Sequence, residues 1–104
     1  MKKIIDGKRY DTETATKIHE WDNGIYGNDF KSCEEALYKT KNGAYFLYGS
    51  GGPASKYAEP CGNNSMGGGS DIIPMEPEEA FTWLCTHGGE DAAETEFPKF
   101  IKEA

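Results

Sequence analysis

Long apolar runs are missing from this sequence of 104 residues. No stretch approaches the roughly 18 consecutive apolar residues that a membrane-spanning helix needs. The opening letters MKKIIDGKRYDT carry a basic pair but only two apolar residues before a turn signal, which is not the pattern of a secretory signal peptide. We therefore expect a cytoplasmic protein with no membrane contact.

Cysteine and histidine are also scarce. Three widely spaced cysteines, Cys33, Cys61 and Cys85, without a secretory signal argue against a disulfide framework, so we expect reduced thiols with at least one of them buried. No C-x-x-C pair supports a zinc site. Cys85 and His87 stand two positions apart in an expected helix and so point in different directions. With no nucleophile elbow, HExxH or kinase signature, the sequence predicts a protein that is not an enzyme and has no metal or cofactor.

Basic charge is lacking in one part of the chain only. The net charge is −7, yet residues 1–70 carry nine Lys/Arg and nine Asp/Glu, which cancel. Residues 71–104 carry two lysines against nine acids, which gives the whole −7. An acidic surface repels nucleic acid and attracts basic partners over long range, so direct nucleic-acid binding is not expected.

Aromatic residues, by contrast, are plentiful. They make up 12 % of the chain and hydrophobic residues 37 %, enough to bury a core and offset chain entropy. The length favours one domain over residues 1–104. Strand patterns come first and helix patterns last, which predicts an α+β fold with a small antiparallel sheet packed on one or two C-terminal helices.

Two hairpins are expected in this sheet. Asp6-Gly7 suits a type I′ turn within residues 2–11, and Asn42-Gly43 joins two aromatic-rich runs over residues 36–49. A two-residue loop at Asn42-Gly43 would pair Lys39 with Phe46 and Leu37 with Tyr48. Both faces of this hairpin carry aromatic residues, so we expect it to be central and covered. Alternation over residues 14–21 indicates a further strand.

Two helical segments are expected in the C-terminal third, residues 76–104. Pro77 suits the first position of a helix, and Gly88 suits the residue just beyond its end. Ala80, Phe81 and Leu84, with Cys85 beside them, would form its buried face. A second, short segment would begin at Thr95 as its cap, which places Pro98 in the first turn.

A glycine-rich loop is predicted over residues 49–71. Its start, GSGGPA, matches G-x-G-x-x-A, but Pro60 and Gly62 follow where a dinucleotide site needs a helix. Loops of this length inside compact domains are usually functional or disordered, and we expect an ordered contact surface that uses Lys56, Tyr57 and Asn63. The alternative is a small-ligand or nucleotide site, because consecutive backbone N–H groups in glycine-rich turns bind anions without any motif.

The acidic third is the other candidate contact surface. Carboxylates on a rigid helix can stand in for a row of phosphates and occupy the nucleic-acid groove of a basic protein. The ordinary alternative is a solvated helix face that keeps a small domain soluble. The candidate contact residues are Glu78, Glu79, Glu90, Asp91, Glu94 and Glu96.

Four segments, IIDGKRYDTETAT, EEALYKTKNGAYFLYGSGG, SKYAEPCGNNS and IIPMEPEEAFTW, resemble a family of small acidic proteins from phages, plasmids and integrated elements of Gram-positive bacteria. The resemblance implies an accessory protein of a mobile element, a group that includes anti-CRISPR proteins and other inhibitors of host defence. It would act as a monomer or small homo-oligomer. Its partner would be a basic host protein, such as a CRISPR effector nuclease or its RNA complex.

Overall fold

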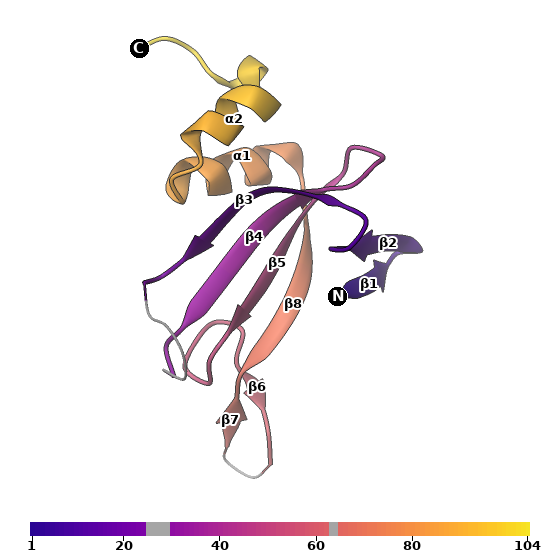
Figure 1. Ribbon diagram of the computed structural model, residues 1–104, viewed down its shortest axis with the longest axis vertical. Coiled ribbons are helices and arrows are strands. Elements are labelled where there is room, and N and C mark those ends of the chain that lie inside the picture. Colours follow the sequence, from indigo (N-terminus) through magenta and orange to yellow (C-terminus); the bar gives the residue numbers. More distant parts are fainter. Residues whose placement is uncertain (25–29, 63–64) are drawn as a thin grey trace.

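The computed structural model describes residues 1–24, 30–62 and 65–104. It has an α+β fold, as predicted, in which the helices lie at one end of an elongated molecule and a small hairpin at the other (Figure 1). The elements are β1 (Lys2–Ile5), β2 (Lys8–Asp11), β3 (Thr16–Asp22), β4 (Cys33–Lys39), β5 (Tyr45–Gly51), β6 (Glu59–Pro60), β7 (Met66–Gly67), β8 (Gly69–Met75), α1 (Pro77–Thr86), α2 (Glu90–Glu96) and the 3-10 turn η1 (Pro98–Phe100).

The main sheet has four antiparallel strands in the order β3-β4-β5-β8. The strands β4 and β5 are central, which confirms the expectation that their hairpin is covered. β1 and β2 form a separate two-stranded hairpin, as do β6 and β7. In the β1–β2 hairpin both turn residues have positive φ angles, 52° at Asp6 and 76° at Gly7, so the predicted type I′ turn is confirmed.

The register of the β4–β5 hairpin differs from the prediction by one residue. Lys39 pairs with Tyr45 and Leu37 with Leu47, so residues 40–44 form a longer connection than a two-residue loop. Thr40 causes the difference, because its N–H donates to the carbonyl of Ala44 (2.8 Å) while its hydroxyl accepts the N–H of Ala44 (3.0 Å). Only Gly43 in this turn needs a positive φ, 86°, whereas a type I′ turn needs two such residues.

Each face of the main sheet has its own apolar cluster. On one face Leu37 and Leu47 pack against the helices, together with Tyr45, Ala80, Trp83, Leu84, Ala93 and Phe97. On the opposite face Phe46 and Ile72 pack against Tyr10 of the N-terminal hairpin. The Tyr10 ring meets Phe46 edge-on at 5.6 Å between centroids, and Tyr38 stacks on Phe46 at 5.2 Å. The protein therefore consists of three layers: helices, sheet and hairpin.

The helices differ from the prediction in detail. α1 begins at Pro77, as predicted, and Gly88 beyond its end has a φ of 75°. Its buried face is Ala80, Trp83 and Leu84, whereas Cys85 is exposed, because Trp83 and not Cys85 points towards the sheet. The prediction that a second helical segment begins at Thr95 was wrong. α2 spans Glu90–Glu96, so Thr95 lies in its last turn, and the 3-10 turn η1 follows at Pro98–Phe100.

The loop in the glycine-rich segment is shorter than the predicted range of 49–71. Gly49 and Gly51 belong to the end of strand β5 and pair with Asp71 and Gly69 of β8. Both ends of the segment are therefore part of the main sheet. Between them β6 and β7 form a small hairpin.

Among the described residues no helix is long and apolar enough to cross a membrane.

Candidate functional site

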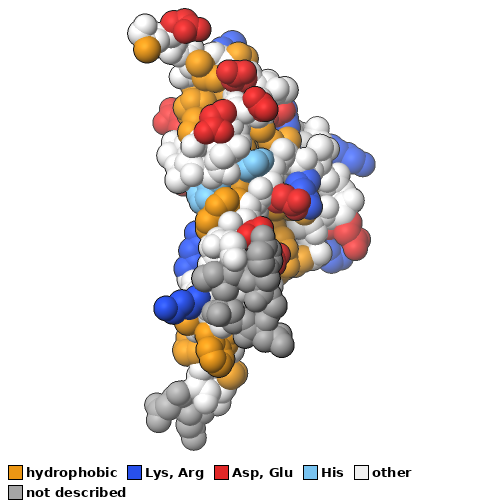
Figure 2. Space-filling view, turned by 60° about the vertical axis from the view of Figure 1, so that its left-hand side comes forward, with side chains coloured by type: hydrophobic (Ala, Val, Ile, Leu, Met, Phe, Trp, Pro, Cys, Tyr) orange, Lys and Arg blue, Asp and Glu red, His pale blue; other side chains and the backbone are white. Residues whose placement is uncertain are grey.

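Five of the predicted contact residues are exposed on the two helices at one end of the molecule. The side chains of Glu78 and Glu79 lie in the first turn of α1, and those of Glu90, Asp91 and Glu94 lie on α2; all five residues are exposed. Figure 2 shows Asp and Glu side chains gathered over this end of the protein. We call these five residues the acidic helical surface.

Glu79 also has a structural role within this surface. Its Oε1 accepts the backbone N–H of Glu76 at 3.0 Å, which satisfies one of the unpaired N–H groups that open helix α1. Acidic side chains in a first helical turn are in addition stabilised by the positive end of the helix dipole. Part of the acidic charge in the first turns of α1 and α2 therefore serves the helices themselves.

Glu96, the sixth predicted acidic contact, belongs to the fold and not to the acidic helical surface. Its Oε1 accepts hydrogen bonds from Lys39 Nζ (3.0 Å) and from the Tyr45 hydroxyl (2.8 Å). The bond from Lys39 is the largest cause that lowers the pKa of Glu96, while burial raises the pKa of Tyr45 above its ordinary value. The side chain of Glu96 therefore turns inward and ties α2 to the central hairpin, which does not favour its predicted role as a partner contact.

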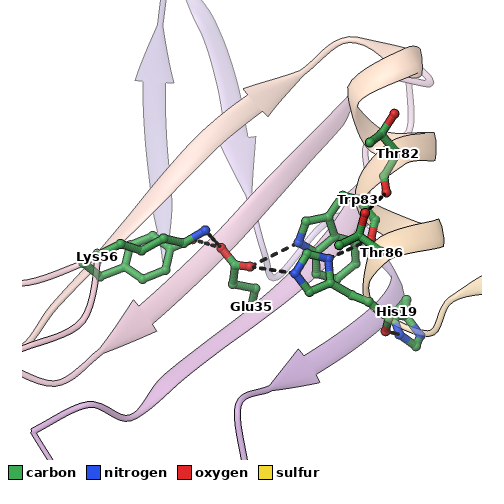
Figure 3. Close-up of polar contacts among 8 residues, drawn as sticks. His19, Glu35, Lys56, Thr82, Trp83 and Thr86 are labelled. Atoms are coloured by element: carbon green, nitrogen blue, oxygen red, sulfur yellow. Dashed lines mark hydrogen bonds and ion pairs between the residues drawn. The ribbon is translucent and has the colours of Figure 1, made fainter.

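A buried carboxylate, Glu35, lies at the centre of the molecule. The residue is 3 % exposed, and it stands on the same side of β4 as Cys33 and Leu37. Its Oε2 receives the hydroxyl of Tyr57 and the ammonium of Lys56 (2.6 Å), and its Oε1 receives the indole N–H of Trp83 at 3.2 Å (Figure 3). His87 Nε2 lies 3.7 Å from Oε1. We call these five residues the Glu35 cluster.

The electrostatics of this cluster favour a charged carboxylate. Burial alone raises the pKa of Glu35, but the hydrogen bonds from Lys56, Tyr57 and Trp83 outweigh it and hold the pKa below its ordinary value. Burial, and then the hydrogen bond to Glu35, raise the pKa of Tyr57 well above the usual range of a phenol. Burial likewise raises the pKa of the Cys33 thiol. The cluster therefore contains a fixed anion that is paired with the Lys56 cation and accepts hydrogen bonds from Tyr57 and Trp83. Neither Tyr57 nor the neighbouring Cys33 is an activated nucleophile.

His87 of the Glu35 cluster and His19 lie where the end of α1 meets β3. The ring of His87 stacks on Trp83 with 4.6 Å between centroids, and its Nδ1 lies 2.8 Å from the Trp83 carbonyl. Since a carbonyl only accepts, Nδ1 carries a proton and Nε2 faces Glu35. His19 Nε2 in turn lies 2.9 Å from the carbonyl of His87, so it donates there and joins β3 to the end of the helix. Both rings serve the helix–sheet contact.

The predicted contact residues of the loop differ in burial and in pairing. Tyr57 is 7 % exposed, which does not favour its predicted role as a partner contact. Its ring lies directly over Gly49, where a Cβ would overlap the ring atoms. Lys56 is exposed, but its ammonium is paired with Glu35. Asn63 lies outside the described residues. The structure thus brings Lys56 and Tyr57 to Glu35 and Trp83, and not to the acidic helical surface.

Sequence reasoning missed Glu35 altogether. It stands in the pair Glu34-Glu35, which looks like a solvated charge at the start of a strand. A signal was nevertheless present, because Glu35 stands between the apolar residues Cys33 and Leu37 on one face of the strand. The buried donors Trp83 and Tyr57 could not be found in this way, since they lie far from Glu35 in the sequence.

Comparison of this chain with protein-family models, with curated proteins and with solved structures finds no match.

Proposed function

We propose that this protein is a non-enzymatic inhibitor that binds a basic, nucleic-acid-binding protein through its acidic helical surface. The resemblance to accessory proteins of mobile elements makes a CRISPR effector nuclease of the bacterial host the most concrete partner, with the host cytoplasm as the place of action. The carboxylates of α1 and α2 would occupy positions that nucleic-acid phosphates otherwise take. The rest of the fold would hold these two helices rigidly.

One observation carries this proposal. None of Glu78, Glu79, Glu90, Asp91 and Glu94 forms an ion pair with any residue in the ranges 1–24, 30–62 and 65–104, whereas Glu35, Glu96 and Asp71 are all paired. Unpaired like charges on one surface repel each other, and a basic partner relieves that repulsion. The two helices that carry this surface are anchored to the sheet, because Ala80, Trp83 and Leu84 of α1 and Ala93 of α2 are buried in the core.

Competition for DNA tests the proposal. Purified protein is added to a guide-loaded CRISPR effector nuclease and a fluorescently labelled DNA target, and DNA binding is followed by anisotropy. We expect the protein to displace the DNA, and we expect this effect to weaken steeply between about 50 and about 300 mM salt, because salt screens contacts between exposed charges. No displacement from any member of a panel of effectors would contradict the proposed partner.

A pair of charge-matched variants tests the surface itself. Glu78→Lys/Asp91→Lys/Glu94→Lys reverses three charges of the acidic helical surface and spares Glu79, which caps α1. Glu13→Lys/Glu34→Lys/Glu59→Lys makes the same change in net charge at exposed positions elsewhere. We expect the first variant to lose inhibition by at least about tenfold and the second to keep it. Equal losses would show that net charge, and not this surface, drives binding.

The second function, capture of a small anion by the glycine-rich segment, has less support. Backbone N–H groups of this segment already donate within the protein: Gly52 to Ser32, Ala54 to Phe30, Ser55 to Gly52, Ala58 to Ser55 and Cys61 to Ser65. Such groups cannot also form an anion-binding nest without breaking these bonds. In addition, Gly49 and Gly51 are glycines because segment 55–57 lies against them.

A further inference from the structure

A groove with a basic lining lies on the N-terminal side of the fold. It runs between the β1–β2 hairpin and the β4–β5 turn and has a volume of about 690 Å³. Lys8 and Arg9 line it from the hairpin, and Lys41 lines it from the turn. Asp11 is the acid in this lining. We call this feature the basic groove.

The cations of the basic groove are not used by the fold. Lys3, Lys17, Lys39 and Lys56 each lie within 3.0 Å of a carboxylate oxygen. Lys8, Arg9 and Lys41 are all exposed and pair with no carboxylate among the described residues. Three like charges around one hollow repel each other, and a bound anion relieves that repulsion. In a chain of net charge −7, this gathering of cations does not follow from composition.

Neutral donors complete the lining. The Thr40 hydroxyl accepts the N–H of Ala44 at 3.0 Å, which leaves its own proton for another acceptor. The Asn42 side chain is exposed at the rim. The turn that carries Lys41 is closed by hydrogen bonds from Thr40 to Ala44 and from Gly43 to Thr40 (2.8 and 3.0 Å). One Asp11 carboxylate oxygen already accepts the N–H of Glu13 at 2.9 Å, which lessens its repulsion of an anion.

We propose that the basic groove binds a phosphorylated small molecule of about mononucleotide size. Lysine and arginine are the side chains that bind phosphate in proteins, and three of them match a ligand that carries more than one negative charge. A volume of about 690 Å³ falls within the usual range of small-molecule sites. A long nucleic acid fits less well, because the acidic remainder of the protein repels an extended polyanion. This site is separate from the acidic helical surface and does not depend on the function proposed for it.

Titration of the whole protein with pyrophosphate and with ATP tests the proposal. Two-dimensional amide NMR at low salt would follow Lys8, Arg9 and Lys41, whose signals we expect to shift together with one saturating curve. Lys8→Glu/Lys41→Glu should weaken binding by at least about tenfold. Lys99→Glu/Lys102→Glu makes the same change in net charge at exposed lysines near the C-terminus and should leave the affinity unchanged within about twofold.

The possible outcomes separate clearly. Tighter binding of ATP than of pyrophosphate supports the proposal and adds a contact to the nucleoside, while equal binding supports recognition of the phosphates alone. No binding of either ligand at millimolar concentration overturns it, and so does an equal loss in both variants. Tighter binding of a single-stranded oligonucleotide than of ATP also overturns it. Lys8→Gln/Lys41→Gln, a milder change, serves if the reversal variant fails to fold.

Discussion

Tyr57 donates its phenolic proton to the buried carboxylate of Glu35, although the two residues stand 22 positions apart in the sequence. This bond lies where two covers of the same sheet face meet. The helix α1 covers one part and supplies Trp83, while segment 55–57 covers the next part and supplies Tyr57. Glu35 therefore holds both covers at once. It also ties segment 55–57 to β4 through Lys56 and Tyr57.

Removal of this carboxylate should destabilise the whole fold. Glu35→Ala leaves the buried donors of Tyr57 and Trp83 without their acceptor, and each unsatisfied donor costs about 1–3 kcal/mol. We expect a loss of about 2–4 kcal/mol in the free energy of unfolding, measured by urea denaturation. Glu34→Ala, on the exposed side of the same strand, should change it by less than about 0.5 kcal/mol. Equal effects of the two variants would show that the Glu35 cluster does not contribute to the free energy of unfolding.

Close approach of Tyr57 to Gly49 gives a second prediction. Gly49→Ala places a methyl group inside the space of the Tyr57 ring, and overpacking of this kind costs about 1–3 kcal/mol. Ser50→Ala, the next residue along β5, lies on the other face and should be close to neutral. In the double variant Gly49→Ala/Tyr57→Ala the clash is absent, so its destabilisation should be smaller than the sum of the single effects. Strict additivity in this cycle would contradict the packing described above.

Local signals in the sequence predicted the parts of the fold that local chemistry decides. Asp6-Gly7 defines its own turn because both residues tolerate positive φ, and Pro77 defines the start of α1 because it needs no N–H partner there. The Asn42-Gly43 pair predicted a strand register that differs from the observed register by one residue. The Thr40 hydroxyl closes a longer turn through a local hydrogen bond from the N–H of Ala44, which the Asn-Gly pair alone does not reveal.

The candidate sites were predictable to different degrees. The charge imbalance of residues 71–104 pointed to Glu78, Glu79, Glu90, Asp91 and Glu94, which are all exposed, and their role as partner contacts stays a prediction. The imbalance could not separate Glu96, because Lys39 and Tyr45 reach that carboxylate only after the sheet has formed. The basic groove was hidden for the same reason, since its cations come from two hairpins and cancel against acids in the count.

The tether between Glu96 and the central hairpin gives a third prediction. Glu96→Gln removes the charge that holds Lys39 and the Tyr45 hydroxyl, so α2 should open more readily from the sheet. We expect a loss of about 1 kcal/mol in stability and faster hydrogen exchange at the amides of α2, with little change in β4 and β5. Glu94→Gln, exposed on the same helix, is the control. Unaltered exchange in α2 would mean that its apolar contacts alone hold it.

Acid should unfold the protein through its paired carboxylates. The hydrogen bonds from Lys39 to Glu96 and from Lys3 to Asp71 lower these pKa values, and the pKa of Glu35 is also below its ordinary value. A lowered folded-state pKa adds stability above the unfolded value, about 4.3 for Glu and about 3.9 for Asp, and this stability is lost as the pH falls through the folded value. We therefore expect constant stability from these groups above about pH 5.5 and a steady decrease below it.

Denaturant unfolding between about pH 3 and pH 7 would measure this dependence. Glu35→Gln should be less stable than the wild type at neutral pH and should lose less of its stability on acidification, because the substituted side chain has no proton to gain. Asp71→Asn should alter the curve only slightly, because the Lys3–Asp71 pair is largely exposed, with side chains 44 % and 46 % accessible. A Glu35→Gln curve parallel to that of the wild type would show that folding does not lower the pKa of Glu35.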